Sequence, residues 1–318
     1  MSYQKLFAVT ILAIGILLSG APVRAEWNAV KTVTYQTVKI DGLDIFYREA
    51  GERSKPTILL LHGFPTSSFM FRNLIPQLSR DFHIVAPDYP GFGQSSMPKV
   101  GEFDYTFENL ANIVDKFTQK LKINKYSLYV QDYGSPIGFR LALKHPERVQ
   151  ALIIQNGNAY ESGLSEKAQF LKTYGETRDP QLTEMLRGFL KLETTKFQYV
   201  HGARNPNLIS PDTWTHDQAL LDRAGNAEIQ LALFADYSSN VRSYPLWHEY
   251  FRQKQPPALV VWGKNDPFFT VNGVEEGYKK DLKNIEINYF DGGHFVLEEY
   301  TDEIAGKIRS FLDKQKIR

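Results

Sequence analysis

The chain has 318 residues and no cysteine, which excludes a disulfide scaffold, a thiol nucleophile and a thiolate metal site. Lysine and arginine number 37 against 36 aspartate and glutamate residues, so the sequence carries no charge signature of nucleic-acid binding. Hydrophobic residues make up 42% of the chain, enough for a large core, and small-molecule chemistry is the default expectation.

The first 25 residues predict a signal peptide. Lys5 supplies the positive charge, 6–20 form an apolar run, and Ala25 is the small residue before the expected cleavage site. The run is shorter than the roughly 20 apolar residues that span a bilayer. We therefore expect export, to the periplasm or outside the cell, with no stable membrane insertion after cleavage. Loss of Lys5 and Arg24 leaves 35 basic against 36 acidic residues.

After this segment the chain alternates short β-branched runs with helical stretches, which is typical of a mostly parallel sheet covered on both faces. The segments 32–40 and 43–50 predict an opening hairpin around an Asp-Gly turn. Further strands are expected at 57–61, 83–86, 126–131, 149–155, 258–262 and 285–290. The sequence therefore predicts about eight strands.

Stretches between the strands place apolar residues three and four positions apart, which predicts helices with one buried face. They span 106–121, 135–145 and 301–314. The segment 157–256 holds helical patterns rich in aromatic residues but no convincing strand.

These elements predict an α/β fold, a mostly parallel sheet with helices on both faces. We expect the core to consist of 26–156 and 257–318. The segment 157–256 is expected to form a helical cap inserted after the sixth strand.

The segment VQDYGS at 130–135 lies between a predicted strand and a predicted helix. Ligands bind in open α/β sheets just past the C-terminal ends of the strands. A sharp turn at such a place often presents a nucleophile, and Asp132 stands where a serine is more familiar, with Gly134 two residues later. A strand-end aspartate that merely caps a helix is at least as common, so Asp132 needs partners to be decisive.

Two later strand ends supply those partners. WGKNDP contains Asp266 after the next-to-last strand, and GGHF contains His294 after the last one. The order of nucleophile, acid and histidine along the chain is the order that such a site requires. We predict a catalytic triad in which Asp132 is the nucleophile, His294 the base and Asp266 the acid that orients it.

The other histidines share no spacing that indicates chemistry, and structural roles are expected for them. His201 and His216 with Asp212 are the alternative as metal ligands, but the sequence lacks the paired helical spacing of an HExxH site. We expect no metal and no cofactor.

The segment LHGFP at 61–65 follows another strand and predicts an oxyanion hole. Its Phe64 N–H can point toward the same place as the Tyr133 N–H, and two such backbone donors stabilise an oxyanion. His62 is expected to hold this loop by hydrogen bonds. The glycine-rich segment 88–95 lacks the third glycine and the helix of a dinucleotide site and is expected to be a turn.

A carboxylate nucleophile changes the reaction. A serine must lose a proton before it attacks, whereas an aspartate with an ordinary pKa of about 3.9 is anionic at neutral pH. Asp132 can therefore attack an sp³ carbon directly and form an ester, and His294 then activates the water that hydrolyses it.

The segments HGFP, PDYPGFGQS, VQDYG, WGKNDPF and GGHF together resemble the epoxide hydrolase and haloalkane dehalogenase branch of the α/β-hydrolase family. The resemblance spans roughly residues 33–318 and is strongest outside the predicted cap. It implies a hydrolase that acts on a small apolar substrate and water, with no nucleic acid as partner. The oligomeric state stays open.

Conversion of an apolar epoxide to a diol is the leading hypothesis. Epoxide hydrolases of this family use two cap tyrosines as acids, and Tyr174 in FLKTYGE and Tyr237 in LFADYSSN resemble those two positions. Packing inside the cap is the alternative role for each tyrosine.

Hydrolytic dehalogenation of a haloalkane is the second hypothesis. Dehalogenases of this family usually place Trp after the nucleophile and often Asn after the His-Gly pair, where this chain has Tyr133 and Phe64. A cap indole, Trp214 or Trp247, could then serve as halide donor. A relative that binds a ligand without turnover is the third hypothesis, although binding alone would not demand a complete triad.

Overall fold

The computed structural model describes residues 32–318. The predicted signal peptide lies outside the described residues, and export stays a prediction. None of the helices in the described part has the length and apolar character that a bilayer span requires.

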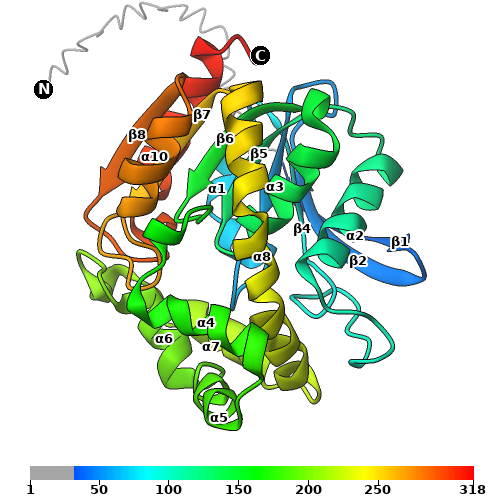
Figure 1. Ribbon diagram of the computed structural model, residues 1–318. Coiled ribbons are helices and arrows are strands. Elements are labelled where there is room, and N and C mark those ends of the chain that lie inside the picture. Colours follow the sequence, from blue (N-terminus) through cyan, green and yellow to red (C-terminus); the bar gives the residue numbers. More distant parts are fainter. Residues whose placement is uncertain (1–31) are drawn as a thin grey trace, which may run out of the picture. The chain divides into compact units, whose positions relative to one another are not determined.

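The centre of the described chain is an eight-stranded sheet with the strand order β1-β2-β4-β3-β5-β6-β7-β8 (Figure 1). The β1–β2 and β2–β4 pairs are antiparallel, and every pair from β4 to β8 is parallel. The strands are β1 (Thr34–Ile40), β2 (Leu43–Ala50), β3 (Thr57–Leu61), β4 (His83–Pro87), β5 (Tyr126–Gln131), β6 (Val149–Gln155), β7 (Ala258–Gly263) and β8 (Ile285–Phe290).

The inner parallel strands β3, β4, β5 and β7 are largely apolar rather than alternating because both faces of this part of the sheet are covered, whereas the edge strand β8 alternates. Every residue of β3, β4, β5 and β7 is buried. The opening strand β1 is mostly exposed, as its place at the sheet edge requires. The predicted mostly parallel sheet is confirmed.

Helices cover both faces of the sheet and create two separate apolar cores. One core contains residues of α2 and α3 and of the long helix α8, and the other contains residues of α1 and α10. The helices of these layers are α1 (Leu74–Leu78), α2 (Phe107–Lys120), α3 (Gly134–Lys144), α8 (Asn226–Lys254), α9 (Lys279–Asp281) and α10 (Leu297–Lys314).

Between β6 and β7 the chain forms helices only, which lie past one end of the sheet (Figure 1). They are α4 (Glu166–Thr177), α5 (Pro180–Gly188), α6 (Leu192–Val200), α7 (Asp212–Leu221) and the first half of α8. The second half of α8 packs on the core, where Trp247 and Phe251 contact Phe139 of α3. The helical insertion is therefore present, although α8 belongs to both layers.

Two helix boundaries differ from the sequence-based expectation for a physical reason. Helix α10 begins at Leu297 rather than at 301, because a kink at Tyr300 (φ −122°, ψ 24°) interrupts the apolar periodicity there. Helix α3 begins at Gly134, directly after the turn at Asp132, which places its N-terminus at the predicted nucleophile.

Candidate active site

Asp132 occupies a strained turn between β5 and α3. Its φ of 49° lies in the left-handed region, which is uncommon for any residue with a side chain. The turn closes tightly because residue 134 is a glycine: a Cβ there would lie 2.1 Å from the carbonyl oxygen of Leu61 on β3. The turn therefore projects the Asp132 side chain out past the end of the sheet, as expected for a nucleophile elbow.

Two backbone N–H groups point at the Asp132 carboxylate. The Phe64 N–H donates to Oδ1 at 2.7 Å, and the Tyr133 N–H at the start of α3 also hydrogen-bonds this carboxylate. Gly63 allows this close approach, because a Cβ there would lie 2.3 Å from the Asp132 Cβ. The structure thus brings together the two donors that the sequence predicts as an oxyanion hole.

His294 and Asp266 meet at the ends of β8 and β7. The His294 Nδ1 lies 2.7 Å from the Asp266 Oδ2, and both side chains are almost fully buried. Asp266 Oδ2 also accepts a hydrogen bond from the Asn156 Nδ2 at 2.8 Å. Its Oδ1 accepts from the backbone N–H groups of Phe268 and Phe269. Four donors therefore hold this carboxylate in one orientation, which in turn orients the imidazole.

The other nitrogen of His294 faces the predicted nucleophile. Its Nε2 lies 3.9 Å from the Asp132 Oδ2, so a small movement or one water molecule can connect them. The ring contacts Phe268, Phe269 and Phe295 and is 1% exposed. Burial lowers the pKa of His294. The charges of Asp266 and Asp132 and the hydrogen bond to Asp266 raise the pKa by a larger amount, so the net direction is upward.

Burial has the opposite consequence for Asp132, because it disfavours the charged carboxylate. Desolvation raises the pKa of Asp132, while His294 and the N–H groups of Phe64 and Tyr133 lower it. The net direction is upward. Because the carboxylate sits at the N-terminus of α3, the helix dipole also favours its charged form.

These groups face a mainly apolar cavity of about 40 Å³ that lies between the sheet and the insertion. Phenylalanine supplies much of its wall, and the insertion supplies residues from α4, α6 and α8. Its lining residues are Phe64, Asp132, Tyr133, Ala168, Phe170, Leu171, Phe189, Gln198, Phe234, Tyr237, Phe268, Phe269 and His294. A cavity of this size has room for very few water molecules.

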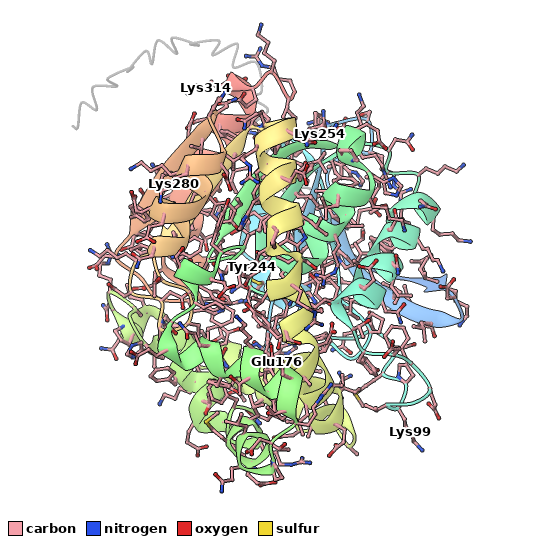
Figure 2. The ribbon with its side chains drawn as sticks, in the orientation of Figure 1. Lys99, Glu176, Tyr244, Lys254, Lys280 and Lys314 are labelled. Carbon is pink, nitrogen blue, oxygen red and sulfur yellow. The ribbon has the colours of Figure 1, made fainter. Side chains whose placement is uncertain are left out.

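Of the two predicted cap tyrosines, Tyr237 lies at this cavity and Tyr174 does not. Tyr237 is hydrogen-bonded to Tyr244, about two turns further along α8, and the Tyr244 hydroxyl accepts from Asn158. Tyr244 lies near the middle of α8 in Figure 2. The Tyr174 hydroxyl instead accepts a 3.4 Å hydrogen bond from Thr183 of α5. The expectation of a tyrosine pair at the site is therefore corrected: Tyr174 packs inside the insertion.

The two indoles considered as halide donors also lie away from the cavity. Trp247 packs against Phe139 and the Arg140 guanidinium, and Trp214 contacts Tyr199 and Lys196. Among residues 32–318, no group of three His, Asp or Glu side chains is arranged to hold a metal.

His62 takes the structural place that the sequence indicates. Its Nδ1 lies 3.0 Å from the Gly63 carbonyl oxygen, and its ring stacks on Tyr89 at 4.1 Å. Burial lowers its pKa to about 4, so it is neutral at physiological pH. His62 thus supports the oxyanion loop. The glycine-rich segment 88–95 forms the predicted turn, in which Asp88 accepts from the backbone N–H groups of Ser68 and Gln94.

Three polar residues of the site were not predicted from the sequence. Asn156 binds Asp266, Gln131 contacts His294, and Gln198 of α6 lines the cavity with an Nε2 that has no hydrogen-bond partner within the described chain. Asn156 and Gln131 lie at strand ends, so the rule that found the triad could have found them. Gln198 carries no sequence signal, because nothing in a helix of the insertion tells which residue faces the substrate.

A family model described as the alpha/beta hydrolase fold matches residues 56–300. This chain belongs to the α/β-hydrolase family. It is 44% identical over 278 residues to an uncharacterized hydrolase of Saccharomyces cerevisiae, with 86% of this chain and 94% of the yeast protein covered.

Two other relatives carry names of specific activities. One is epoxide hydrolase 4 of Mus musculus, 26% identical, with 90% of this chain and 81% of the mouse protein covered. The other is a haloalkane dehalogenase of Psychrobacter cryohalolentis, 28% identical, with 85% and 88% covered.

The fold has close counterparts among solved structures. The crystal structure of a haloalkane dehalogenase from Bradyrhizobium elkani aligns with a TM-score of 0.73 at 22% identity, covering 90% of this chain and 99% of that one. The predicted family, fold and hydrolase class are confirmed.

Proposed function

We propose that this hydrolase is an epoxide hydrolase that acts through an ester on Asp132. The observation that carries the proposal is a carboxylate at the elbow, where two N–H groups contact it and the base lies 3.9 Å away. Tyr237, a proton donor, lines the same cavity.

In the first half-reaction, an Asp132 oxygen attacks an epoxide carbon and forms a C–O ester bond. The carbon–oxygen bond of the ring breaks, and the departing oxygen takes the proton of Tyr237. Burial and the charge of Asp132 raise the pKa of Tyr237, so its proton is in place at neutral pH. Tyr244, bonded to the same hydroxyl, can stabilise the resulting phenolate.

In the second half-reaction, His294 takes a proton from water while the water oxygen bonds to the Asp132 carboxyl carbon. The N–H groups of Phe64 and Tyr133 stabilise the oxyanion. Collapse breaks the ester bond, and the alcohol takes the proton from His294. The proton left on the Asp132 carboxyl returns through solvent to Tyr237, and the diol leaves.

The proton donor favours an epoxide over a haloalkane. An alkoxide needs a proton as it leaves, and Tyr237 can supply one, whereas a halide needs only N–H donors. Trp214 and Trp247 lie outside the cavity lining, which weakens the halide alternative. The mouse relative named epoxide hydrolase adds support, and the bacterial relative named haloalkane dehalogenase keeps the second activity as an outcome of the test.

The walls indicate a small apolar substrate. Phe170, Phe189 and Phe234 belong to the insertion and line the cavity together with Asp132. Transfer of apolar surface into such a site is favourable, while a charged group there loses its hydration. Because the cavity is only about 40 Å³, binding of a substrate of more than a few atoms requires these side chains to move apart.

Mass spectrometry of the His294→Gln variant tests the proposal. Without its base the enzyme should form the ester but hydrolyse it slowly, so a styrene-type epoxide should add its full mass to the peptide that contains Asp132. The same variant with Asp132→Asn is the control and should gain no mass. An adduct formed only from a bromoalkane, with bromide released, would assign dehalogenation instead. Saturable binding with no adduct from either substrate would contradict both.

A further inference from the structure

Gln131, the last residue of β5, lies directly beside the proposed base. Its side chain is completely buried, and its Nε2 lies 3.0 Å from the His294 Nε2. Its Oε1 is also buried and has no hydrogen-bond partner among residues 32–318. A buried amide oxygen without a partner is costly, so such a group in a native site calls for an explanation.

The bond to Asp266 determines which proton His294 carries. Because Nδ1 faces the Asp266 carboxylate at 2.7 Å, the neutral imidazole has its hydrogen on Nδ1 and a lone pair on Nε2. Gln131 Nε2 is a donor, so it pairs with that lone pair. The resting contact is therefore consistent with a neutral base held toward the carboxylate.

The same contact cannot persist once the base has taken a proton. In the imidazolium both ring nitrogens are donors, so the Gln131 Nε2 would face another donor. Rotation of the side-chain amide by about 180° replaces Nε2 with Oε1, and this terminal torsion of glutamine is a soft one. The oxygen that lacks a partner in the resting state would then accept from His294.

We propose that Gln131 is a positioning residue for ester hydrolysis, whose amide donates to neutral His294 and turns to accept from the imidazolium. The inference rests on the proposed function, because the imidazolium forms when water attacks the ester on Asp132. The first half-reaction needs no proton transfer to His294, so it does not use this rotation.

The charged groups that face His294 are Asp266 and Asp132, and the other contacts of its ring are the phenylalanines 268, 269 and 295. Esterification removes the charge of Asp132. In the ester intermediate, Asp266 and the residue at position 131 are therefore the groups that decide how readily His294 is protonated.

The test separates the two half-reactions in Gln131→Leu and Gln131→Glu. Rapid-quench mass spectrometry follows formation and decay of the Asp132 ester from pH 5 to pH 9. In Gln131→Leu, formation should stay close to wild type, while decay should slow about tenfold to a hundredfold. Loss of the Gln131 oxygen that accepts from the imidazolium should lower the pKa of His294. The acid limb of the pH–rate profile for ester decay should therefore move to lower pH. The added charge in Gln131→Glu should move that limb to higher pH.

Gln155 offers a matched control. It pairs with Gln131 in the register of β5 and β6 and is equally buried, but its oxygen accepts from the Tyr129 hydroxyl, away from His294. Gln155→Leu should leave both half-reactions within about twofold of wild type, which controls for loss of a buried amide at this level of the sheet.

The outcomes distinguish this inference from the function on which it rests. Absence of an ester in every variant and in wild type would overturn the proposed function. An ester that forms normally in Gln131→Leu and decays at the wild-type rate with an unshifted acid limb would overturn the role of Gln131 alone. If Gln131→Leu does not fold, Gln131→Glu has nearly the same shape, and an unshifted limb there would have the same meaning.

Discussion

The two sides of the cavity use polar groups in different ways. On the sheet side, both oxygens of Asp266 accept two hydrogen bonds each, and Asp132 Oδ1 accepts from Phe64. On the side of the insertion, the Gln198 Nε2 has no partner in the described chain, and phenylalanine side chains form most of the surface. Tyr237 is the other polar group contributed by that side.

This difference separates chemistry from recognition. Groups that must act in a fixed geometry are held by the ends of a rigid sheet, so they need no reorganisation when charge develops. The insertion leaves a buried donor for the substrate and surrounds it with apolar side chains. The sheet side should therefore control ester hydrolysis and pH dependence, while the insertion should control which substrates bind and, through Tyr237, supply the proton for ester formation.

The largest expected effect is the loss of activity in acid. Ester formation needs ionised Asp132, and burial raises the pKa of this carboxyl group above the ordinary value of about 3.9. Below that raised pKa, in the acid limb of the pH–rate profile, the rate of ester formation should fall about tenfold per pH unit. Ester hydrolysis needs neutral His294. In the ester the charge of Asp132 is gone, and Asp266 still raises the pKa of His294 against its desolvation. An imidazole titrates at higher pH than a carboxyl group, so hydrolysis should be lost at higher pH than ester formation. Wild-type enzyme should thus accumulate the ester between the two limbs, as intact mass would reveal.

The proton donor that the insertion contributes can be removed in the same experiment. Tyr237→Phe should lower the rate of ester formation but leave the position of its acid limb in place, because the limb reports Asp132. A limb that moves with Tyr237 would show that the insertion also sets the protonation of the nucleophile, which contradicts the separation.

A smaller effect is expected from Asn156→Gly. Asn156 has a φ of 41°, so glycine keeps the backbone conformation while the amide that binds Asp266 is lost. Asp266 Oδ2 keeps its bond to His294 but loses the second one. A hydrogen bond to a charged group contributes about 1.5–3 kcal/mol, so ester hydrolysis should slow about tenfold to a hundredfold with ester formation much less affected. Single-turnover kinetics would measure both steps, and equal slowing of the two would indicate general disorder of the site.

The smallest effect belongs to Gln198→Leu. Removal of the free donor should raise KM about threefold to tenfold for substrates with a hydrogen-bond acceptor beyond the reacting carbon, with kcat nearly unchanged. Purely apolar epoxides of the same length are the matched controls and should bind equally well or better. Steady-state kinetics with such a substrate pair would decide, and a fall in kcat with unchanged KM for both would place Gln198 in the chemistry.

The triad was predictable because its members follow strands. Periodic apolar runs locate the strands, and parallel strands direct their C-terminal ends to one edge of the sheet, so Asp132, Asp266 and His294 could be assigned to one site from order alone. The oxyanion loop at Phe64 follows from the same rule.

The insertion resisted prediction for an equally physical reason. A tyrosine on an amphipathic helix faces either a neighbouring helix or the substrate, and both places are apolar, so local sequence cannot separate them. Tyr237 and Tyr174 looked alike in sequence, and only the packing of α4 against α5 and α8 distinguishes them. The first residues of α10, before its kink, were not predicted for a similar reason, since the apolar periodicity breaks at Tyr300.

By itself the sequence determined the fold class, the family and the hydrolase class, because these depend on residue type and on chain order. Tertiary structure alone decided which amide holds each triad member, which tyrosine reaches the cavity and how small the cavity is. Those properties depend on contacts between segments far apart in the chain, such as Gln131 with His294 and Asn156 with Asp266, and such contacts exist only after the helices and strands have packed.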